Sequence, residues 1–198
     1  MDDPWLLVSV STAGAPDSLR VHAWRKLRSL GALYLQQGAC LLPAQQSVAR
    51  ETRRLADRVH RDGGAIRVLR MEFVDNAEER SVIEEFNAAR DAEYAEVLER
   101  IPGLHEELAT ERDRGNITYA EVEESEADLE RFRSWLGKID ARDHFDAPLG
   151  RETREAVDKA AADLEAFEES ALRADASAGA DAAQSLRSLS GRREAAES

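Results

Sequence analysis

The chain has 198 residues, of which 42% are hydrophobic and 34% are charged. This length suits one compact domain with an appendage or two small domains, and the apolar content is enough for a core, which excludes a fully disordered chain. No apolar stretch approaches the roughly 20 residues that span a bilayer, and the start Met1-Asp2-Asp3-Pro4 is not the basic start of a secretory signal. We therefore expect a cytoplasmic protein with no membrane partner.

Charge is distributed unevenly along the chain. Residues 1–70 contain eleven Lys or Arg and six Asp or Glu, a net charge of +5, so the remainder must carry −18 to give the total of −13. An electrostatic footprint depends on where charge clusters and not on the sum over the whole chain. The N-terminal part is therefore compatible with an anionic partner, although the protein as a whole is acidic.

Short strands and helices are predicted to alternate in the N-terminal part. The run from Trp5 to Val10 is typical of a buried strand, and Asp17 or Ser18 can cap a helix that ends at Gly31. A hairpin, a second helix and a fourth strand follow, at 32–36 and 39–42, at 45–62 and at 65–74. Over residues 1–75 this order predicts an α+β fold, the ferredoxin-like βαββαβ sandwich, with both helices on one face of an antiparallel sheet.

The rest of the chain is predicted to be helical and then disordered. A capping box at Asp75 and Glu78 begins a helix that reaches Arg100, and Pro102-Gly103 is expected to separate it from a short helix over 104–114. Two later helices, around residues 118–140 and after residue 150, carry apolar stripes that predict an antiparallel helical hairpin within the region 76–173. Residues 174–198 are rich in Ala, Ser, Asp and Arg and predict a disordered tail.

Basic side chains follow the outer faces of both N-terminal helices. At 100° per residue they fall opposite the apolar residues, and two helices on one sheet face would merge them into a single basic surface. Such a surface can contact DNA phosphates, for which Arg offers bidentate donors. The alternatives are that these residues solvate the helices or dock on the acidic helices downstream. We predict six residues as phosphate contacts: Arg25, Lys26, Arg28, Arg53, Arg54 and Arg58, with Arg50 and Arg61 on the same helix face as the last three.

No catalytic or metal-binding pattern stands out, so we expect no enzyme activity, no cofactor and no metal. The histidines His22, His60, His105 and His144 are scattered singly, without the spacing of a zinc site. The single cysteine, Cys40, lies in an apolar run, which predicts a buried thiol and favours a reducing compartment. Trp24 falls next to Leu27 on the first helix, and we expect it to be buried against the sheet.

Two stretches resemble a known family. The run Leu19-Arg20-Val21-His22-Ala23-Trp24-Arg25-Lys26-Leu27, with Leu30-Gly31-Ala32 and Leu35-Gln36-Gln37-Gly38, is similar to the N-terminal domain of the ChrB proteins, bacterial chromate-resistance regulators. Asp128-Leu129-Glu130-Arg131-Phe132-Arg133, followed by Trp135-Leu136, Ile139-Asp140-Ala141-Arg142-Asp143 and Phe145, resembles the helical segment of that family. The resemblance reaches from about Trp5 to Phe167.

This resemblance implies a DNA-binding transcriptional regulator associated with chromate resistance, whose partner is promoter DNA. Family members commonly continue into a C-terminal domain, which we expect this chain to lack. The alternative is a protein-interaction module that assists a chromate transporter or a separate sensor. A homodimer is also compatible with the sequence, because an edge strand or the helical hairpin could pair symmetrically.

Two further interpretations concern nuclease activity and chromate binding. The sheet also resembles the CRISPR-adaptation endoribonuclease fold and a domain of phenylacetate-pathway repressors, but Ser9-Val10-Ser11 stands where such a nuclease would need a carboxylate for its metal. For an oxyanion the best candidate is Arg142, which could equally pair with Asp140 or Asp146. We therefore expect the isolated chain to bind chromate weakly or not at all.

Overall fold

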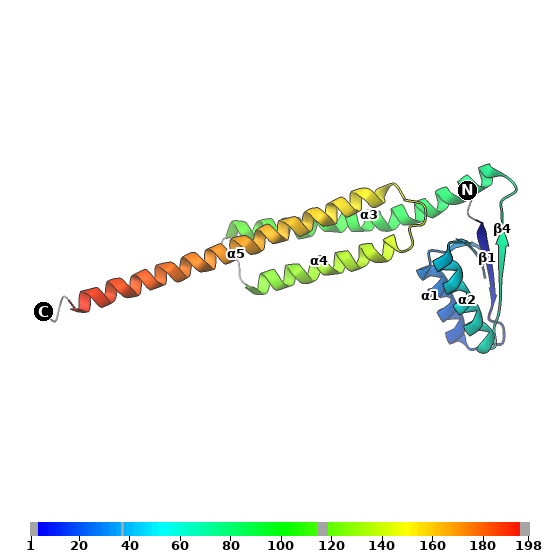
Figure 1. Ribbon diagram of the computed structural model, residues 1–198, viewed down its shortest axis with the longest axis horizontal. Coiled ribbons are helices and arrows are strands. Elements are labelled where there is room, and N and C mark those ends of the chain that lie inside the picture. Colours follow the sequence, from blue (N-terminus) through cyan, green and yellow to red (C-terminus); the bar gives the residue numbers. More distant parts are fainter. Residues whose placement is uncertain (1–3, 37, 115–118, 195–198) are drawn as a thin grey trace. The chain divides into compact units, whose positions relative to one another are not determined.

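Short strands and helices alternate at the N-terminus, and three long helices follow (Figure 1). The computed structural model describes the backbone of residues 4–36, 38–114 and 119–194, and their side chains except at 114, 119, 171, 174–175 and 177–194. The described residues form four strands and five helices, which confirms the α+β class and the predicted order of the strands and helices up to residue 75. In chain order the elements are β1 (Trp5–Ser11), α1 (Asp17–Ser29), β2 (Leu33–Gln36), β3 (Ala39–Pro43), α2 (Gln46–Arg61), β4 (Ala65–Met71), α3 (Asn76–Arg114), α4 (Tyr119–Asp140) and α5 (Leu149–Glu194).

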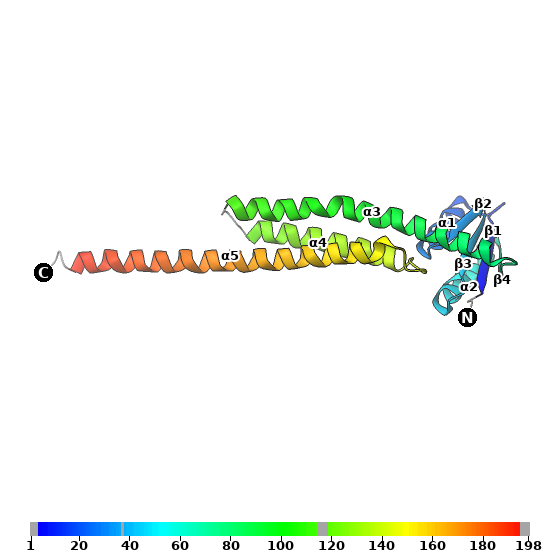
Figure 2. The same ribbon diagram turned by 90° about the horizontal axis from the view of Figure 1, so that it is seen from above.

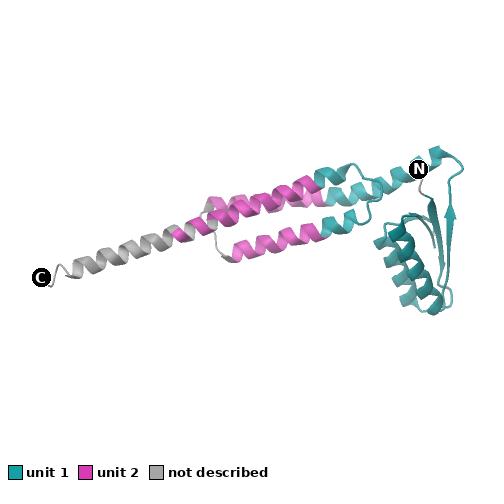
Figure 3. Ribbon diagram, in the orientation of Figure 1, with its two compact units in different colours: residues 1–96, 135–153 teal, residues 97–134, 154–198 magenta. Residues whose placement is uncertain are grey.

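The chain divides into two compact units (Figure 3). The first consists of residues 1–96 and 135–153, and the second of residues 97–134 and 154–198. The sequence pattern predicts a boundary at residue 75, whereas the first unit also takes in the start of α3 and the connection between α4 and α5. The reason is that Phe86 and Phe145 pack against the sheet.

The sheet of the first unit has the strand order β2-β3-β1-β4. Every neighbouring pair is antiparallel, so β1 and β2 run parallel with β3 between them. In β1, Val8 lies opposite Cys40 on one side and Val68 on the other. Because side chains alternate along a strand, β1 supplies residues to two cores, one on each face of the sheet.

The larger core lies between the sheet and helices α1 and α2. It contains Leu6 and Val8 of β1, Leu27 of α1 and Val59 of α2, all of which are buried. Cys40 belongs to this core and is 1% exposed, as predicted. Burial raises the pKa of its thiol to about 12, so the thiol is unreactive at neutral pH.

The opposite face of the sheet carries an aromatic core. Trp5 is 3% exposed and stacks on Phe145 with 5.4 Å between ring centroids, and Phe73 meets Trp5 edge-on at 5.4 Å. Phe86 of α3 lies 5.7 Å from the Trp5 ring. The indole Nε1 of Trp5 donates a hydrogen bond to Glu79 Oε1 at 2.7 Å. These contacts hold the first turns of α3 and the α4–α5 connection on the sheet.

Helix α3 differs from the prediction at Pro102, which does not end the helix. Proline removes one backbone hydrogen bond and costs about 3 kcal/mol in a helix interior. Around it, Val97, Ile101, Leu104 and Leu108 are all at most 4% exposed. Burial of this stripe therefore outweighs the penalty of Pro102, and a sequence pattern does not reveal this balance.

The second unit is built from the part of α3 after residue 96, the part of α4 before residue 135 and all of α5 except its first residues, 149–153. These segments run side by side in both views (Figures 1 and 2). His105 Nδ1 of α3 lies 2.7 Å from Asp163 Oδ2 of α5, and a groove between α4 and α5 is lined by Leu129 and Leu164. Helix α5 continues to Glu194 through the segment 174–194, for which the composition predicts a disordered tail. Its alanines favour helix, while residues 195–198 lie outside the described part.

None of the helices in the described part of the chain is long and apolar enough to cross a membrane.

Candidate nucleic-acid interface

Helices α1 and α2 form one layer on the sheet, and each ends in the same way (Figure 1). Gly31 (φ 77°) and Gly63 (φ 87°) follow the helices in the left-handed conformation that glycine tolerates. The N–H of Ala32 then donates to the carbonyl of Leu27 at 3.1 Å, and the equivalent bond closes α2. Because the apolar stripe of each helix is held in the core, the opposite stripe faces solvent.

Three of the six predicted phosphate contacts are exposed and have no carboxylate partner. Within the part of the chain that is described, no carboxylate lies within 4 Å of Arg25, Arg28 or Arg53. Arg50 and Arg61 on α2 are exposed and unpaired in the same sense. They belong to the outer face that the helical periodicity indicates, although they are not among the six predicted phosphate contacts. We call these five residues the free arginines.

The other three predicted contacts are ion-paired. Lys26 Nζ of α1 lies 2.8 Å from Glu51 Oε2 of α2, and Arg54 Nη1 lies 2.6 Å from Glu51 Oε1. Arg58 Nε is 3.4 Å from Asp62 Oδ2. The hydrogen bond from Lys26 lowers the pKa of the Glu51 carboxyl, and the charges of Lys26 and Arg54 act in the same direction. Lys26 and Glu51 join the two helices, and only part of the charge of the three paired cations is available to a phosphate.

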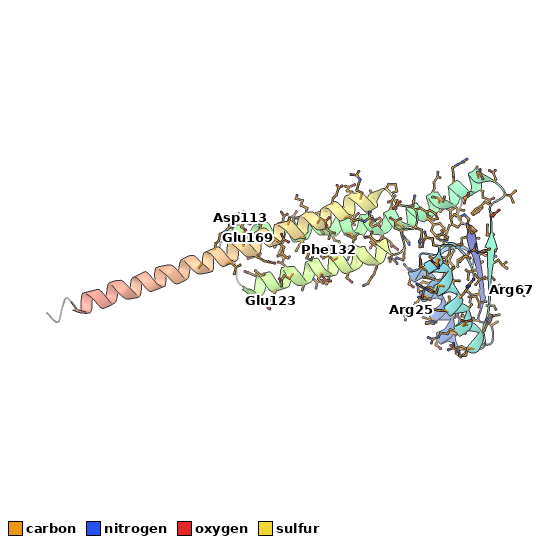
Figure 4. The ribbon with its side chains drawn as sticks, in the orientation of Figure 1. Arg25, Arg67, Asp113, Glu123, Phe132 and Glu169 are labelled. Atoms are coloured by element: carbon orange, nitrogen blue, oxygen red, sulfur yellow. The ribbon has the colours of Figure 1, made fainter. Side chains whose placement is uncertain are left out.

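The free arginines lie on the helix side of the sandwich. Figure 4 labels Arg25 there and Arg67 on the sheet side, on β4. Arg67 is exposed and also unpaired within the described residues, but it faces away from the helix layer. The basic surface predicted from the sequence would therefore consist of residues of α1 and α2 and would not include Arg67. Phosphate binding at this surface stays a prediction.

Trp24 does not occupy the core position predicted for it. Its side chain is 46% exposed, whereas Ala23 and Leu27 are buried. Ala23 takes the inward position and Trp24 is turned toward β2, where the Tyr34 hydroxyl donates to the backbone oxygen of Trp24 at 3.4 Å. The guanidinium of Arg28 lies 5.2 Å from the centre of the indole ring. The prediction was wrong because it assigned a large aromatic residue beside the apolar stripe to the stripe itself.

Arg142, the candidate for an oxyanion, is held by a carboxylate of another helix. Arg142 Nη2 lies 2.8 Å from Glu93 Oε2, and Arg90 Nη2 lies 3.2 Å from Glu93 Oε1. The partner is thus 49 residues away in sequence rather than the neighbouring Asp140 or Asp146. The side chains of Arg90 and Arg142 are only 12% and 17% exposed. An oxyanion would have to compete with Glu93 for this guanidinium.

Arg142 lies in the connection between α4 and α5, and this connection also contacts the end of α1. The Nε2 of His144 lies 2.8 Å from the carbonyl oxygen of Leu30, and a Cβ built on Gly31 would meet Arg142 O at 2.9 Å. Burial lowers the pKa of His144, so the neutral ring that donates to Leu30 is favoured. Tyr94 donates to Asp140 Oδ1 at 2.7 Å and to Asp143 Oδ2 at 3.1 Å. The α4–α5 connection is therefore a polar network that supports the C-terminal end of α1.

The described residues contain no group of three or more His, Cys, Asp or Glu side chains that could hold a metal ion. Ser9 and Ser11 lie at the end of β1, where a nuclease of similar fold would need a carboxylate. The absence of enzyme activity stays a prediction.

Comparisons with known proteins agree on one family. No solved structure matches the chain. Over 105 residues the chain is 29% identical to Protein ChrB of Cupriavidus metallidurans, an alignment that covers 53% of this chain and 32% of that relative. The matched part thus spans about a third of the relative's length. Residues 20–178 match the family described as Protein ChrB, N-terminal. The chain therefore belongs to the ChrB family, through that family's N-terminal region.

Proposed function

We propose that the chain is a DNA-binding transcriptional regulator associated with chromate resistance, as the ChrB resemblance implies. The observation that carries the proposal is the set of free arginines on the outer surface of α1 and α2. Five guanidiniums without carboxylate partners give this surface a positive potential, although the whole chain has a net charge of −13. A duplex carries one negative charge per about 1.7 Å along its axis, so such a surface attracts its backbone.

The arrangement favours contact with phosphates over reading of bases. Guanidinium groups offer paired N–H donors that match phosphate oxygens. The ion pair between Lys26 and Glu51 joins α1 to α2, so the free arginines of both helices are held on one scaffold. We also infer that this scaffold is a ferredoxin-like sandwich, because both helices cover one face and β1 and β2 are separated by β3.

The experiment is a double charge reversal at two free arginines, Arg25→Glu with Arg53→Glu. Arg54 is a poorer choice than the helical periodicity suggests, because its replacement would also disturb Glu51. Binding to a DNA fragment from upstream of the chain's own gene is measured by fluorescence anisotropy over a series of salt concentrations. A matched control reverses two exposed charges of the second unit, Arg112→Glu with Lys159→Glu.

The double variant should bind DNA at least about tenfold more weakly, and the slope of log K against log salt should fall by roughly 2, because each replaced arginine no longer neutralises a phosphate. The control has the same change in net charge and should keep the native slope. Equal losses of affinity in both variants would mean that net charge alone governs binding. If the variant with Arg25 and Arg53 reversed bound DNA with native affinity, the proposal that this surface binds DNA would be wrong.

A second candidate function is a protein-interaction module, and the edge strands favour it. Strands β2 and β4 are the two edges of the sheet, and both expose large apolar side chains. Leu35 and Leu69 are each 54% exposed. Exposed edges of this kind accept a further strand from a partner or from a second copy of the chain. Sedimentation experiments on the native chain and on Leu69→Lys test self-association. If β4 pairs with a second copy, the native chain should show a mass above 22.0 kDa and the variant should not.

A further inference from the structure

A pocket opens between α1 and the hairpin of β2 and β3, next to the proposed DNA surface. Its volume is about 660 Å³, within the range of roughly 300–1,000 Å³ that small-molecule sites occupy. Helix α1 forms one wall, and the end of β1 and strand β2 form the other. The lining residues are Val10, Ser11, Thr12, Arg20, Ala23, Trp24, Leu27, Tyr34, Gln36 and Gly38.

Two aromatic side chains of this lining are exposed. Trp24 is 46% exposed and Tyr34 is 38% exposed, and the Tyr34 hydroxyl donates a hydrogen bond to the backbone oxygen of Trp24. Trp24 has no core position to fill, as its neighbours Ala23 and Leu27 are buried beneath it. Exposed ring faces of this kind are platforms for planar ligands, because stacking needs an accessible π-surface.

The charge at the pocket points to an anionic ligand. Arg20 lines the pocket, and Arg28 lies over the Trp24 ring without a carboxylate partner in the described part of the chain. Arg20 is paired with Asp17, yet its side chain is 67% exposed and the pair lies in solvent. Among the described residues that line the pocket there is no carboxylate. A planar ligand that carries an anionic group therefore fits better than a cation or a purely apolar segment.

The remaining polar groups suit the edge of a base. Ser11, Thr12 and Gln36 offer hydroxyl and amide groups that can donate and accept hydrogen bonds. Burial raises the pKa of Tyr34 to about 12, so its hydroxyl stays protonated and adds no negative charge to the pocket at neutral pH. Arg28 belongs to the free arginines and also lies over the pocket's Trp24, which makes the pocket continuous with the proposed DNA surface.

We propose that this pocket binds a nucleotide, with the base stacked on Trp24, its edge facing Gln36 and its phosphate held by Arg20 and Arg28. This inference rests on the proposed function where the nucleotide is an unpaired base of DNA. The same chemistry would accept a free nucleotide, and the experiment separates the two sources.

The experiment compares three probes on the native chain and on two variants of Trp24. The probes are a DNA duplex with one unpaired thymine, the same duplex fully paired, and thymidine monophosphate. Trp24→Leu removes the aromatic ring, and Trp24→Phe retains one. Val21→Ser on the same helix serves as a control, because Val21 is 43% exposed and does not line the pocket. Tryptophan fluorescence and the anisotropy of labelled DNA are the readouts.

The native chain should bind the duplex with the unpaired thymine more tightly than the paired one, and its tryptophan fluorescence should be quenched. Trp24→Leu should weaken that binding about tenfold, since stacking of one base contributes on the order of 1–3 kcal/mol. It should leave the paired duplex within about twofold. Trp24→Phe should restore most of the binding but show no quenching, and Val21→Ser should behave as the native chain.

The outcomes that contradict the proposal are distinct. If the paired duplex binds but the unpaired base and the monophosphate neither add affinity nor quench fluorescence, the pocket proposal is wrong and the proposed function stands. If no DNA binds while the monophosphate quenches Trp24, the proposed function is wrong and the pocket serves a free nucleotide. Equal sensitivity of both duplexes to Trp24→Leu would also overturn the pocket proposal, because Trp24 would then act through Arg28.

Discussion

Arginines occupy two regions of the first unit with opposite consequences. On the outer surface of α1 and α2, Arg25 and Arg53 are exposed and have no carboxylate partner in the described part of the chain. At the α4–α5 connection, Arg90 and Arg142 are 12% and 17% exposed and share the carboxylate of Glu93. Residue type alone does not separate the two pairs, whereas burial and the nearest carboxylate do.

The difference follows from the cost of burying a charge. A guanidinium in water needs no partner, so an exposed arginine is available to a ligand at little cost in stability. A buried guanidinium must be compensated, and the carboxylate of Glu93 does this for Arg90 and Arg142, although each retains a buried Nε without a hydrogen-bond partner in the described residues. Burial also lowers the pKa of Arg90. The buried arginines therefore belong to the fold, and the exposed ones are the candidates for binding.

Replacement of Arg142 by Ala should produce the largest effect on stability. The change removes one of the two cations that compensate the partly buried Glu93, and we expect a loss of about 3 kcal/mol in the free energy of unfolding. Urea unfolding followed by tryptophan fluorescence measures it, because Trp5, Trp24 and Trp135 all belong to the first unit. Arg25→Ala is the matched control and should stay within about 0.5 kcal/mol. Similar values for the two variants would abolish the distinction between the regions.

Gly31→Ala tests whether the two regions depend on each other. Alanine is strained at φ 77°, and its Cβ would lie 2.9 Å from the backbone oxygen of Arg142. We expect a loss of about 2 kcal/mol in unfolding free energy. Gly63→Ala has a similar φ of 87° but meets nothing within 4 Å, so the difference between the variants measures the contact alone. Equal losses would show that strain, and not contact with the connection, sets the cost.

Tyr94→Phe isolates the hydrogen bonds of the connection from its packing. Tyr94 is fully buried, and its hydroxyl donates to Asp140 and Asp143. Phenylalanine keeps the ring, so we expect a loss of about 1.5 kcal/mol from the hydrogen bonds that the hydroxyl no longer donates. Urea unfolding again provides the measurement. A neutral result would show that water replaces the hydroxyl, and the connection would then be less tightly organised than its distances suggest.

The outer surface was accessible to sequence reasoning because it depends on local periodicity. A rotation of 100° per residue along a helix places Arg25 and Arg53 opposite buried residues. The glycines after each helix were recognisable as its end. The ion pair between Lys26 and Glu51 was not accessible, since it requires the distance between two helices. The pairs of Arg54 with Glu51 and of Arg58 with Asp62 are different, because their partners lie three and four residues apart along the chain. Periodicity could thus select the face and indicate pairs between near neighbours, but it could not pair Lys26 with a carboxylate of the other helix.

The connection could not be predicted, because its main contacts join distant parts of the sequence. Glu93 and Arg142 are 49 residues apart, and Leu30 and His144 are 114 apart. The sequence suggested only neighbouring carboxylates for Arg142. The prediction for Trp24 was wrong for a different reason. Its position lies at the border of the apolar stripe, where a small rotation of the helix decides whether the side chain enters the core or the pocket.

The smallest expected effect is the pH dependence contributed by His144, a single titrating group. Its ring faces the carbonyl of Leu30, the charges of Arg90 and Asp143, and the aromatic rings of Phe86 and Phe145. Burial lowers its pKa below the value near 6.5 of the unfolded chain, and the charge of Arg90 adds to this, against the opposing effects of Leu30 and Asp143.

Because the unfolded chain binds the proton more readily, the contribution of His144 is fully present above about pH 6.5 and is lost as the pH falls through its pKa in the fold. His144→Gln retains an N–H donor for Leu30 but does not titrate, so its unfolding free energy should depend less on pH between about 7.5 and 5 than that of the native chain. Parallel curves for the two proteins would contradict the buried, neutral state assigned to this ring.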